Sequence, residues 1–350
     1  MRRPRLIIDD AIPYLRGRLE EAFECEYMPG RNIGREDVRG ADGLLVRTRT
    51  RCDARLLEGS GVSFVATGTI GLDHFDTGWL TSSGIDWQNA PGCNAPAVAQ
   101  YVWSVLLRLG FHLPPTAGAA ERELRPMTLG VVGKGHVGSI VVEWGRMLGA
   151  EVLVCDPPRR EAGERDEDYL SLEELSERCD ALTFHTPLTD CGRHATRHLC
   201  DASILRRLHP GVILINAARG GVVDEAALRE AAGDLSLRVA IDTWEGEPRI
   251  SAATMAMTDI ATPHIAGYSR QGKERATMAI LTGLERHFGV TLPKEGLAGP
   301  YKSPTALTPL PILESFDPMP LDAMLRAESE DFETLRDSYI FRDEPKYRTL

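Results

Sequence analysis

The sequence predicts an α/β protein with two doubly wound parallel-sheet domains and a small C-terminal appendage. Three observations support this fold class. Short apolar runs alternate with segments of helical period along most of the chain. Polar residues follow nearly every apolar run, and prolines become frequent after residue 290. The chain of 350 residues also exceeds the usual size of a single domain.

The first sheet domain is expected over residues 1–93. Its strand-like runs lie at residues 5–8, 43–46 and 62–67. A helix is expected over residues 12–23. Thr48 and Thr69 follow two of the runs, and ligands of parallel sheets bind where the strands end. Both threonines are therefore candidate ligand contacts, although from the pattern alone capping of a strand end is the preferred explanation.

A long apolar helix is expected directly after this domain. Val98, Val102 and Val105 recur at helical spacing within it. Because it separates two α/β units, the helix suits a connector between domains. An ordinary core helix would show the same pattern.

A glycine turn between a strand and a helix predicts a dinucleotide site. Gly133, Gly135 and Gly138 form the pattern G-x-G-x-x-G. These glycines allow a tight turn, close approach of a pyrophosphate and close packing of the helix. The helix N-terminus favours the diphosphate, and Asp156 follows the next strand, where a carboxylate can accept ribose hydroxyls. We therefore expect a Rossmann-like domain over residues 94–266.

The acid after the second strand also bears on the choice of cofactor. Arg159 and Arg160 follow Asp156 and could admit a 2′-phosphate. The carboxylate of Asp156 would repel that phosphate. NAD is therefore expected rather than NADP.

Later strand ends supply groups suited to oxidising a hydroxy acid. The runs lie at residues 181–184, 212–215, 237–241 and 259–261. Arg219 precedes two glycines, which would free its guanidinium to hold a carboxylate at two points. A surface ion pair with Asp224 is the alternative for this arginine.

A histidine and a glutamate complete this set of candidate catalytic groups. His264 follows Pro263 at a strand end and could take a hydroxyl proton. A single histidine is more often structural than catalytic. Glu247 could hydrogen-bond the imidazolium, and Glu245 competes with it on spacing alone.

Composition indicates a protein with reduced cysteines that acts on small molecules. Forty Lys and Arg against 51 Asp and Glu give a net charge of −11, which argues against non-specific nucleic-acid or anionic-membrane binding. The seven cysteines form no C-x-x-C pair, which favours the cytoplasm. No membrane segment and no metal site are expected. The local basic run of Arg47, Arg49 and Arg51 could bind a substrate phosphate, although such runs are usually solvated faces.

Three fragments carry a family resemblance: NAARGGVVDEAAL, DTWEGEP and TPHIAGYS. They resemble, in order, the Arg, Glu and His signatures of the D-isomer-specific 2-hydroxyacid dehydrogenases. The fragments VRTRT, GTIGLDH, APGCNAPAVAQYV, LVCDPPR and LTFHTPL narrow the resemblance. They are similar to a branch that oxidises a phosphorylated four-carbon hydroxy acid during vitamin B6 synthesis. Together the fragments and their surroundings cover roughly residues 5 to 288.

The resemblance implies a role for each matched residue. Arg219 would hold the substrate carboxylate, His264 would act as acid and base, and Glu247 would support His264. Thr48, Thr69 and Tyr268 would contact the substrate. The implied NAD contacts are His136, Val137, Asp156, Thr186, Ala217, Ala218, Arg219, Asp242 and Gly267. A turn before Pro187 is the alternative for Thr186.

The resemblance also implies a domain plan. Residues 1–93 and 267–289 would form a discontinuous substrate-binding domain, because a helix expected over residues 268–287 could return to it. Residues 94–266 would bind NAD. Residues 290–350 would be a dimerisation-type extension of a homodimer, although this tail departs most from the family and could instead be partly disordered.

Two other functions stay open on the sequence. One is a dehydrogenase for D-3-phosphoglycerate or another D-2-hydroxyacid, which would share all three catalytic residues. The other is a non-enzymatic, NAD-sensing binder of the corepressor type, which uses the same fold.

Overall fold

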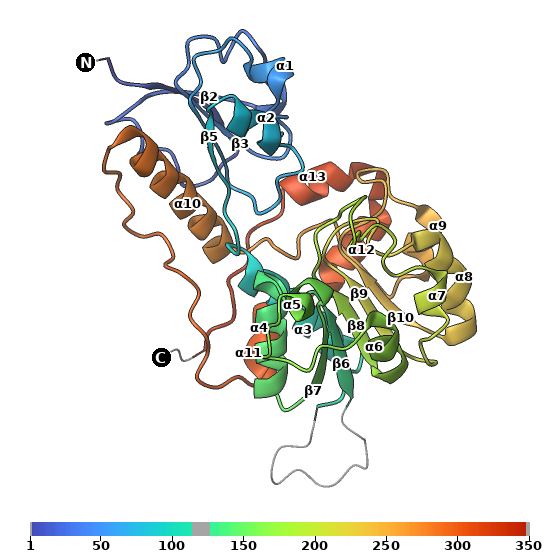
Figure 1. Ribbon diagram of the computed structural model, residues 1–350. Coiled ribbons are helices and arrows are strands. Elements are labelled where there is room, and N and C mark those ends of the chain that lie inside the picture. Colours follow the sequence, from blue (N-terminus) through green and yellow to red (C-terminus); the bar gives the residue numbers. More distant parts are fainter. Residues whose placement is uncertain (1, 114–126, 348–350) are drawn as a thin grey trace. The chain divides into compact units, whose positions relative to one another are not determined.

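The computed structural model describes residues 2–113 and 127–347. The chain divides into two compact units (Figure 1). The first comprises Met1–Asn94 and Ser269–Tyr301, and the second comprises Ala95–Tyr268 and Lys302–Leu350. Each contains one parallel sheet, so the predicted fold class is confirmed.

The first unit is built on a five-stranded sheet in the order β2-β1-β3-β4-β5. Its strands are β1 (Arg5–Asp9), β2 (Glu24–Met28), β3 (Gly43–Val46), β4 (Phe64–Thr67) and β5 (Asp86–Gln88). This order is the doubly wound, flavodoxin-like one. Its short helices are η1 (Gly30–Asn32), α1 (Ala54–Leu57) and α2 (Thr77–Ser82). The long helix α10 (Arg270–Phe288) packs on β4 and β5, burying Ile280, Leu281 and Leu284.

The prediction of a helix over residues 12–23 is wrong, because this segment consists of turns and bends. Tyr14 has a φ of 62° and Gly17 a φ of 80°, and neither value is compatible with a right-handed helix. The apolar residues that suggested a helix, including Leu15 and Leu19, are nevertheless fully buried. Their spacing therefore reflects burial on the sheet rather than a helical backbone.

The second unit is built on a six-stranded parallel sheet in the order β11-β10-β9-β8-β6-β7. Its strands are β6 (Thr128–Val132), β7 (Glu151–Cys155), β8 (Ala181–Phe184), β9 (Ile213–Asn216), β10 (Arg238–Ile241) and β11 (Ile260–Ala261). The chain moves from β6 to β7 on one side and then to β8 on the other side of β6. Ligands bind at such a reversal, outside the carboxyl ends of the strands.

Helices cover both faces of this second sheet. They are α3 (Ala95–Arg108), α4 (His136–Met147), α5 (Pro157–Glu161), α6 (Leu172–Arg178), α7 (Ala202–Leu205), α8 (Glu225–Leu235) and α9 (Ala252–Met257). Gly130 of β6 faces Leu175 of α6, whereas the next residue, Val131, faces Gly138 of α4. Adjacent residues of a strand point to opposite faces, so α4 and α6 lie on opposite sides of the sheet.

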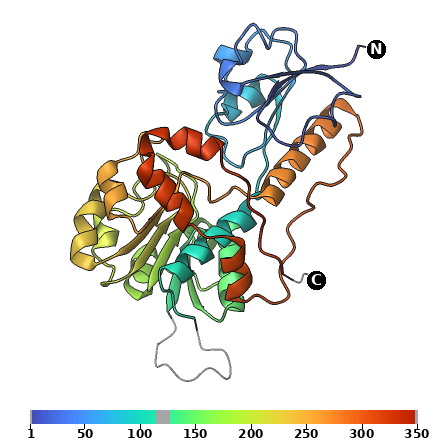
Figure 2. The same cartoon turned by 180° about the vertical axis from the view of Figure 1, so that it is seen from behind.

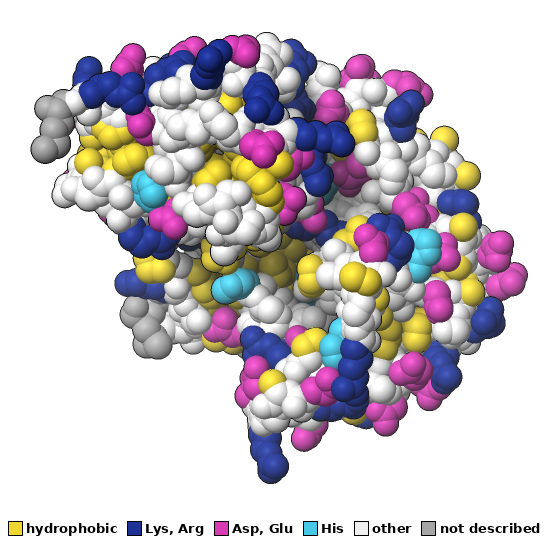
Figure 3. Space-filling model, turned by 45° about the horizontal axis from the view of Figure 1, so that its top comes forward, with side chains coloured by type: hydrophobic (Ala, Val, Ile, Leu, Met, Phe, Trp, Pro, Cys, Tyr) yellow, Lys and Arg dark blue, Asp and Glu magenta, His cyan; other side chains and the backbone are white. Residues whose placement is uncertain are grey.

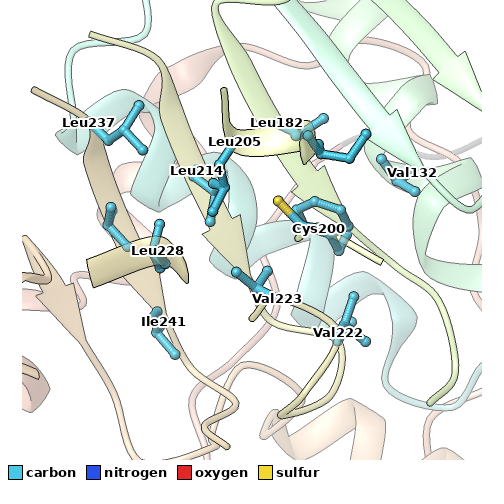
Figure 4. Packing of buried hydrophobic residues seen from close by; sticks show 14 of the residues in the cluster. Val132, Leu182, Cys200, Leu205, Leu214, Val222, Val223, Leu228, Leu237 and Ile241 are labelled. Atoms are coloured by element: carbon cyan, nitrogen blue, oxygen red, sulfur yellow. The ribbon is translucent and has the colours of Figure 1, made fainter. Parts of the chain in front are cut away.

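The core of the second unit holds its strand ends in register. Leu182, Leu214 and Ile241 come from three neighbouring strands and pack with Leu228 of α8 (Figure 4). Each of these four side chains is at most 1% exposed. A close-packed core fixes the positions of the loops that leave it.

The C-terminal segment packs on the second unit (Figure 2). It contains α11 (Pro309–Ser315), α12 (Met319–Ala327), η2 (Ser329–Asp331) and α13 (Phe332–Asp337). Phe332 and Leu335 join the core, and Asp322 accepts a hydrogen bond of 2.7 Å from the Ala261 amide at the sheet edge. The residues assigned to one extension, 290–350, are therefore divided between the two units near residue 301.

The described part of the chain contains no helix that is long and apolar enough to cross a membrane. All seven cysteines are free thiols, and five of them are buried.

Candidate active site

The three glycines of the predicted turn meet different spatial demands. Gly133 has a φ of 87°, and a Cβ there would lie 2.8 Å from the carbonyl oxygen of His185. A Cβ on Gly138 would lie 1.9 Å from the carbonyl oxygen of Gly133. A Cβ on Gly135 would meet nothing within 4 Å. Because α4 begins at His136, this open space lies at a helix N-terminus, where anions bind.

The acid after β7 fastens the glycine turn. Asp156 accepts a hydrogen bond of 2.7 Å from the Lys134 amide and one of 3.2 Å from the Arg159 amide, and it caps α5. The guanidinium of Arg159 pairs with Glu164 at 2.7 Å. Asp156 thus joins the turn to the end of β7, and its contact with a ribose stays a prediction.

A buried hydroxyl at the end of β8 has no hydrogen-bond partner among the described residues. It is Oγ1 of Thr186. Buried polar atoms normally have a partner, so this atom fits a site completed by a ligand. The open space at Gly135 and the hydroxyl of Thr186 follow β6 and β8, the two strands that flank the reversal of strand order. Both features fit a dinucleotide.

The loop after β9 positions Arg219. Asn216 holds this loop, because its side-chain amide donates to the Arg219 carbonyl at 3.0 Å and its side-chain oxygen accepts from the Ala218 amide at 3.2 Å. Gly220 lies so close to the next loop that a Cβ would be 1.9 Å from the Trp244 carbonyl oxygen. The loops after β9 and β10 are therefore in backbone contact. The sequence did not single out Asn216, although its place at a strand end was a signal.

The predicted pair of His264 and Glu247 is formed. The distance between Nδ1 of His264 and Oε2 of Glu247 is 2.7 Å, and Oε1 of Glu247 accepts from the Trp244 amide at 2.8 Å. The competing Glu245 instead contacts Nε2 of His198 at 2.9 Å. The structure thus distinguishes two glutamates that spacing alone could not.

The electrostatics of this pair assign its proton. Burial acts to raise the pKa of Glu247, but the hydrogen bond and charge of His264 outweigh it and hold that pKa below its usual value. Since an ionised carboxylate only accepts hydrogen bonds, Nδ1 of His264 carries the proton in this pair. Nε2 is then the nitrogen that can accept a proton from a substrate, and the His264 side chain is 28% exposed.

Asp242 holds the backbone of the loop that follows β11, residues 262–268, which carries His264 and is called the histidine loop below. Its two carboxylate oxygens accept from the Thr262 hydroxyl at 2.7 Å and from the amides of Ile265 and Ala266 at 2.8 and 2.9 Å. Its carbonyl also accepts from the His264 amide at 2.9 Å. Burial raises the pKa of Asp242 in spite of these bonds. The structure places Asp242 in this supporting position, and its contact with NAD stays a prediction.

A buried arginine from the C-terminal segment supports the same loop. The guanidinium of Arg342 donates to the carbonyls of Ile265, Ala266 and Tyr268 at 3.1, 2.5 and 3.1 Å. It also donates to the side-chain oxygen of Gln100 on α3 at 2.8 Å. Sequence reasoning missed this residue, because nothing distinguishes it from the other charges of the tail.

The remaining predicted NAD contacts of the second unit follow strands at the same edge of its sheet. Parallel strands present their carboxyl ends together, and the loops after β6, β9 and β11 leave from these ends. His136 and Val137 begin α4 after β6, Ala217 and Ala218 follow β9, and Gly267 follows β11. The sheet therefore brings these residues to one edge, while their individual roles stay predictions.

The two predicted threonines belong to the first unit. Thr48 follows β3 and is exposed, and Thr69 follows the neighbouring strand β4. The hydroxyl of Thr69 contacts that of Thr67 at 3.0 Å and donates to the Gly71 carbonyl at 3.1 Å. Both therefore lie at carboxyl ends of neighbouring strands, and their contact with substrate stays a prediction.

Two arginines of the basic run have acidic partners. Arg47 lies 3.4 Å from the buried carboxylate of Asp9, and Arg51 lies 3.0 Å from Asp53. Both side chains therefore take part in ion pairs within the first unit, and phosphate binding by this basic run stays a prediction.

Comparisons with known proteins identify the family. A curated erythronate-4-phosphate dehydrogenase of Bacteroides fragilis is 42% identical over 99% of each chain. The chain belongs to the erythronate-4-phosphate dehydrogenase family. A second member, from Chromohalobacter salexigens, is 45% identical over 96% of this chain and 85% of its own.

This chain also matches the model of a wider domain family. Residues 115–266 match the family model described as D-isomer specific 2-hydroxyacid dehydrogenase, NAD binding domain. The fold is also similar to that of D-lactate dehydrogenase from Aquifex aeolicus, solved with NAD and lactic acid. That similarity has a TM-score of 0.64 and 24% identity over 85% of this chain and all of that one. The predicted resemblance and the expected cofactor, NAD, are confirmed.

Proposed function

We propose that this member of the family oxidises 4-phospho-D-erythronate at C2 with NAD. The product is 2-oxo-3-hydroxy-4-phosphobutanoate, an intermediate of pyridoxal 5′-phosphate (vitamin B6) synthesis. One observation carries the proposal above all. The Glu247–His264 pair follows β10 and β11 of the sheet whose glycine turn fits the dinucleotide.

The side chains divide the chemistry as follows. Nε2 of His264 removes the proton of the 2-hydroxyl, while Glu247 stabilises the imidazolium that forms. Arg219 holds the carboxylate and polarises the forming 2-oxo group. The glycine turn and Thr186 would hold NAD, which would supply the acceptor for the hydride of C2. Tyr268, Thr48 and Thr69 are the further residues that we assign to substrate binding.

A substrate panel tests this function. NADH formation is measured with erythronate 4-phosphate, D-3-phosphoglycerate and D-lactate as substrates. We expect the highest kcat/KM with erythronate 4-phosphate. A preference for 3-phosphoglycerate would support the alternative dehydrogenase, and no NADH with any acid would support the corepressor-type binder.

The variant His264→Ala tests the assignment of the base. Removing a general base typically lowers turnover by about 10²- to 10⁴-fold. NAD affinity, measured by fluorescence quenching, should stay within about twofold of wild type, since the imidazole is assigned to the substrate. Unchanged turnover would disprove the role of His264.

The C-terminal segment supports a homodimer. Among the described residues, six large apolar side chains are exposed, and four of them lie in this segment: Leu310, Met319, Met324 and Ile340. Ile340 is 90% exposed. Exposed apolar groups that gather on one segment mark interaction surfaces, so this segment is the proposed dimer contact.

The surface and the thiols support a cytoplasmic enzyme with a small-molecule partner. Basic and acidic side chains are mixed on the face seen in Figure 3, without a broad patch of basic charge. That distribution does not favour nucleic acid as a partner. Seven free cysteines suit a reducing compartment.

A further inference from the structure

Helix α13 brings a cation to the loop that carries the candidate base. Nε of Arg336 donates to the hydroxyl of Tyr268 at 3.0 Å, and its guanidinium carbon lies 5.9 Å from the centre of the Tyr268 ring. The side chain of Arg336 is only partly exposed. Tyr268 itself lies four residues after His264.

The rest of this guanidinium is uncommitted within the described part of the chain. There, the bond to Tyr268 is the one hydrogen bond of the Arg336 side chain, and no carboxylate lies within 4 Å of its guanidinium. A guanidinium has five N–H donors, so the four on Nη1 and Nη2 remain for a ligand. A partly buried cation without a counter-ion is costly, and an anionic ligand would offset that cost.

The pKa shifts indicate that the guanidinium of Arg336 is charged and lies close to the Glu247–His264 pair. Burial acts to lower the pKa of Arg336, but Tyr268 and the charge of Glu247 keep it above its usual value. Conversely, Arg336 contributes to lowering the pKa of Glu247. The guanidinium is thus near enough to the Glu247–His264 pair to affect it.

The position of Arg336 is also well supported. Phe332 and Leu335 anchor α13 in the core, with exposures of 1% and 8%. Arg342 holds both the end of this segment and the carbonyl of Tyr268. Because both the helix that carries Arg336 and its partner Tyr268 are anchored, the guanidinium loses little conformational freedom when it binds a ligand.

We propose that Nη1 and Nη2 of Arg336 bind the phosphate of the substrate, so that the C-terminal segment forms part of the substrate site. This inference rests on the proposed function. The guanidinium fork matches two phosphate oxygens, and Arg219 is assigned to the carboxylate at the other end of the substrate. With a net charge of −11, the protein needs such a local cation to attract a phosphorylated acid.

The first experiment compares a phosphorylated substrate with its unphosphorylated form. Kinetic constants for erythronate 4-phosphate and erythronate are measured on wild type, Arg336→Ala and Arg336→Lys. We expect Arg336→Ala to lower kcat/KM for the phosphorylated acid by roughly 10- to 100-fold more than it lowers that for erythronate. Arg336→Lys should recover part of the loss, because it restores charge without the fork.

The matched control is Arg207→Ala, which removes a surface arginine that pairs with Glu177. It should leave both substrates unaffected. An equal loss on both substrates in Arg336→Ala would overturn the proposal, because Arg336 would then act on the Glu247–His264 pair. Unchanged constants would overturn it as well.

A binding measurement separates this inference from the proposed function. Inorganic phosphate is titrated into the NADH complex by calorimetry, using wild type and Arg336→Ala. Binding that the variant weakens at least tenfold supports the site, even if wild type does not oxidise erythronate 4-phosphate. In that case the proposed function fails and the anion site stands. Equal phosphate affinity in the two proteins would overturn the site whatever the substrate.

Discussion

The Glu247 carboxylate is bound through both of its oxygens. One oxygen accepts from a backbone amide of its own loop, and the other contacts His264. The first bond fixes the carboxylate, so the second can orient the imidazole with its Nε2 directed to accept a proton. Orientation and charge therefore depend on a single residue.

Replacing Glu247 by Gln should separate these two contributions. An amide can still accept from the Trp244 amide, but it cannot stabilise an imidazolium by charge. We expect turnover to fall by roughly 10²-fold or more, with NAD affinity little changed. The matched control is Glu245→Gln, since Glu245 contacts His198 instead. Equal effects of the two variants on turnover would contradict the assignment.

The same carboxylate makes stability depend on pH. Its folded-state pKa is lowered, so its contribution to the free energy of unfolding is present above the unfolded value of about 4.3 and is lost as pH falls through the folded pKa. Urea unfolding of wild type and Glu247→Gln should therefore show a stability difference near pH 7 that shrinks near pH 3. A stability difference that grows as pH falls would contradict a lowered pKa of Glu247 in the folded state.

At the level of elements, the glycine turn shows that one motif contains different constraints. Gly138 is required by packing within the fold, whereas Gly135 faces open space. Spacing alone could not rank them, because both are glycine in the pattern. The neighbouring backbone makes the difference.

Two alanine variants test this distinction. Gly138→Ala places a Cβ 1.9 Å from a backbone oxygen and should lower the free energy of unfolding by about 1–3 kcal/mol or more. Gly135→Ala meets no neighbour and should leave the melting temperature almost unchanged while weakening NAD binding. Thermal unfolding and NAD titration of both variants check this. Loss of stability in Gly135→Ala with intact NAD affinity would contradict it.

At the scale of the whole molecule, the C-terminal segment has two faces. One packs on the second unit through Phe332 and Leu335, and the other leaves Leu310 and Ile340 exposed. Its inner face supports the histidine loop through Arg342. The exposed side chains are what a partner subunit would cover.

A double variant tests this dimer contact. Leu310→Asp with Ile340→Asp places two charges on the exposed side of the segment, where a partner would have to bury them. We expect wild type to sediment as a dimer and the double variant as a monomer. Met147→Asp is the control, because Met147 is 38% exposed but lies on α4, outside the segment. A wild-type monomer would disprove the dimer.

The sequence by itself determined the α/β class, the nucleotide turn, and the identity of Arg219, Glu247 and His264 as candidates. This was possible because strand patterns and turn glycines are local, and because the polar ends of parallel strands must share one edge of the sheet. The segment 12–23 shows the limit of such patterns, since a series of turns can bury apolar residues at the same spacing as a helix does.

Only the tertiary structure decided which partners these residues have. The loops after β10 and β11 approach each other, so that Glu247 contacts His264 whereas Glu245 contacts His198. Arg336 and Arg342 act across large separations in sequence, and nothing in the tail distinguishes them from its other charged residues. Long-range hydrogen bonds depend on where the packed core delivers each loop, and no local pattern encodes that position.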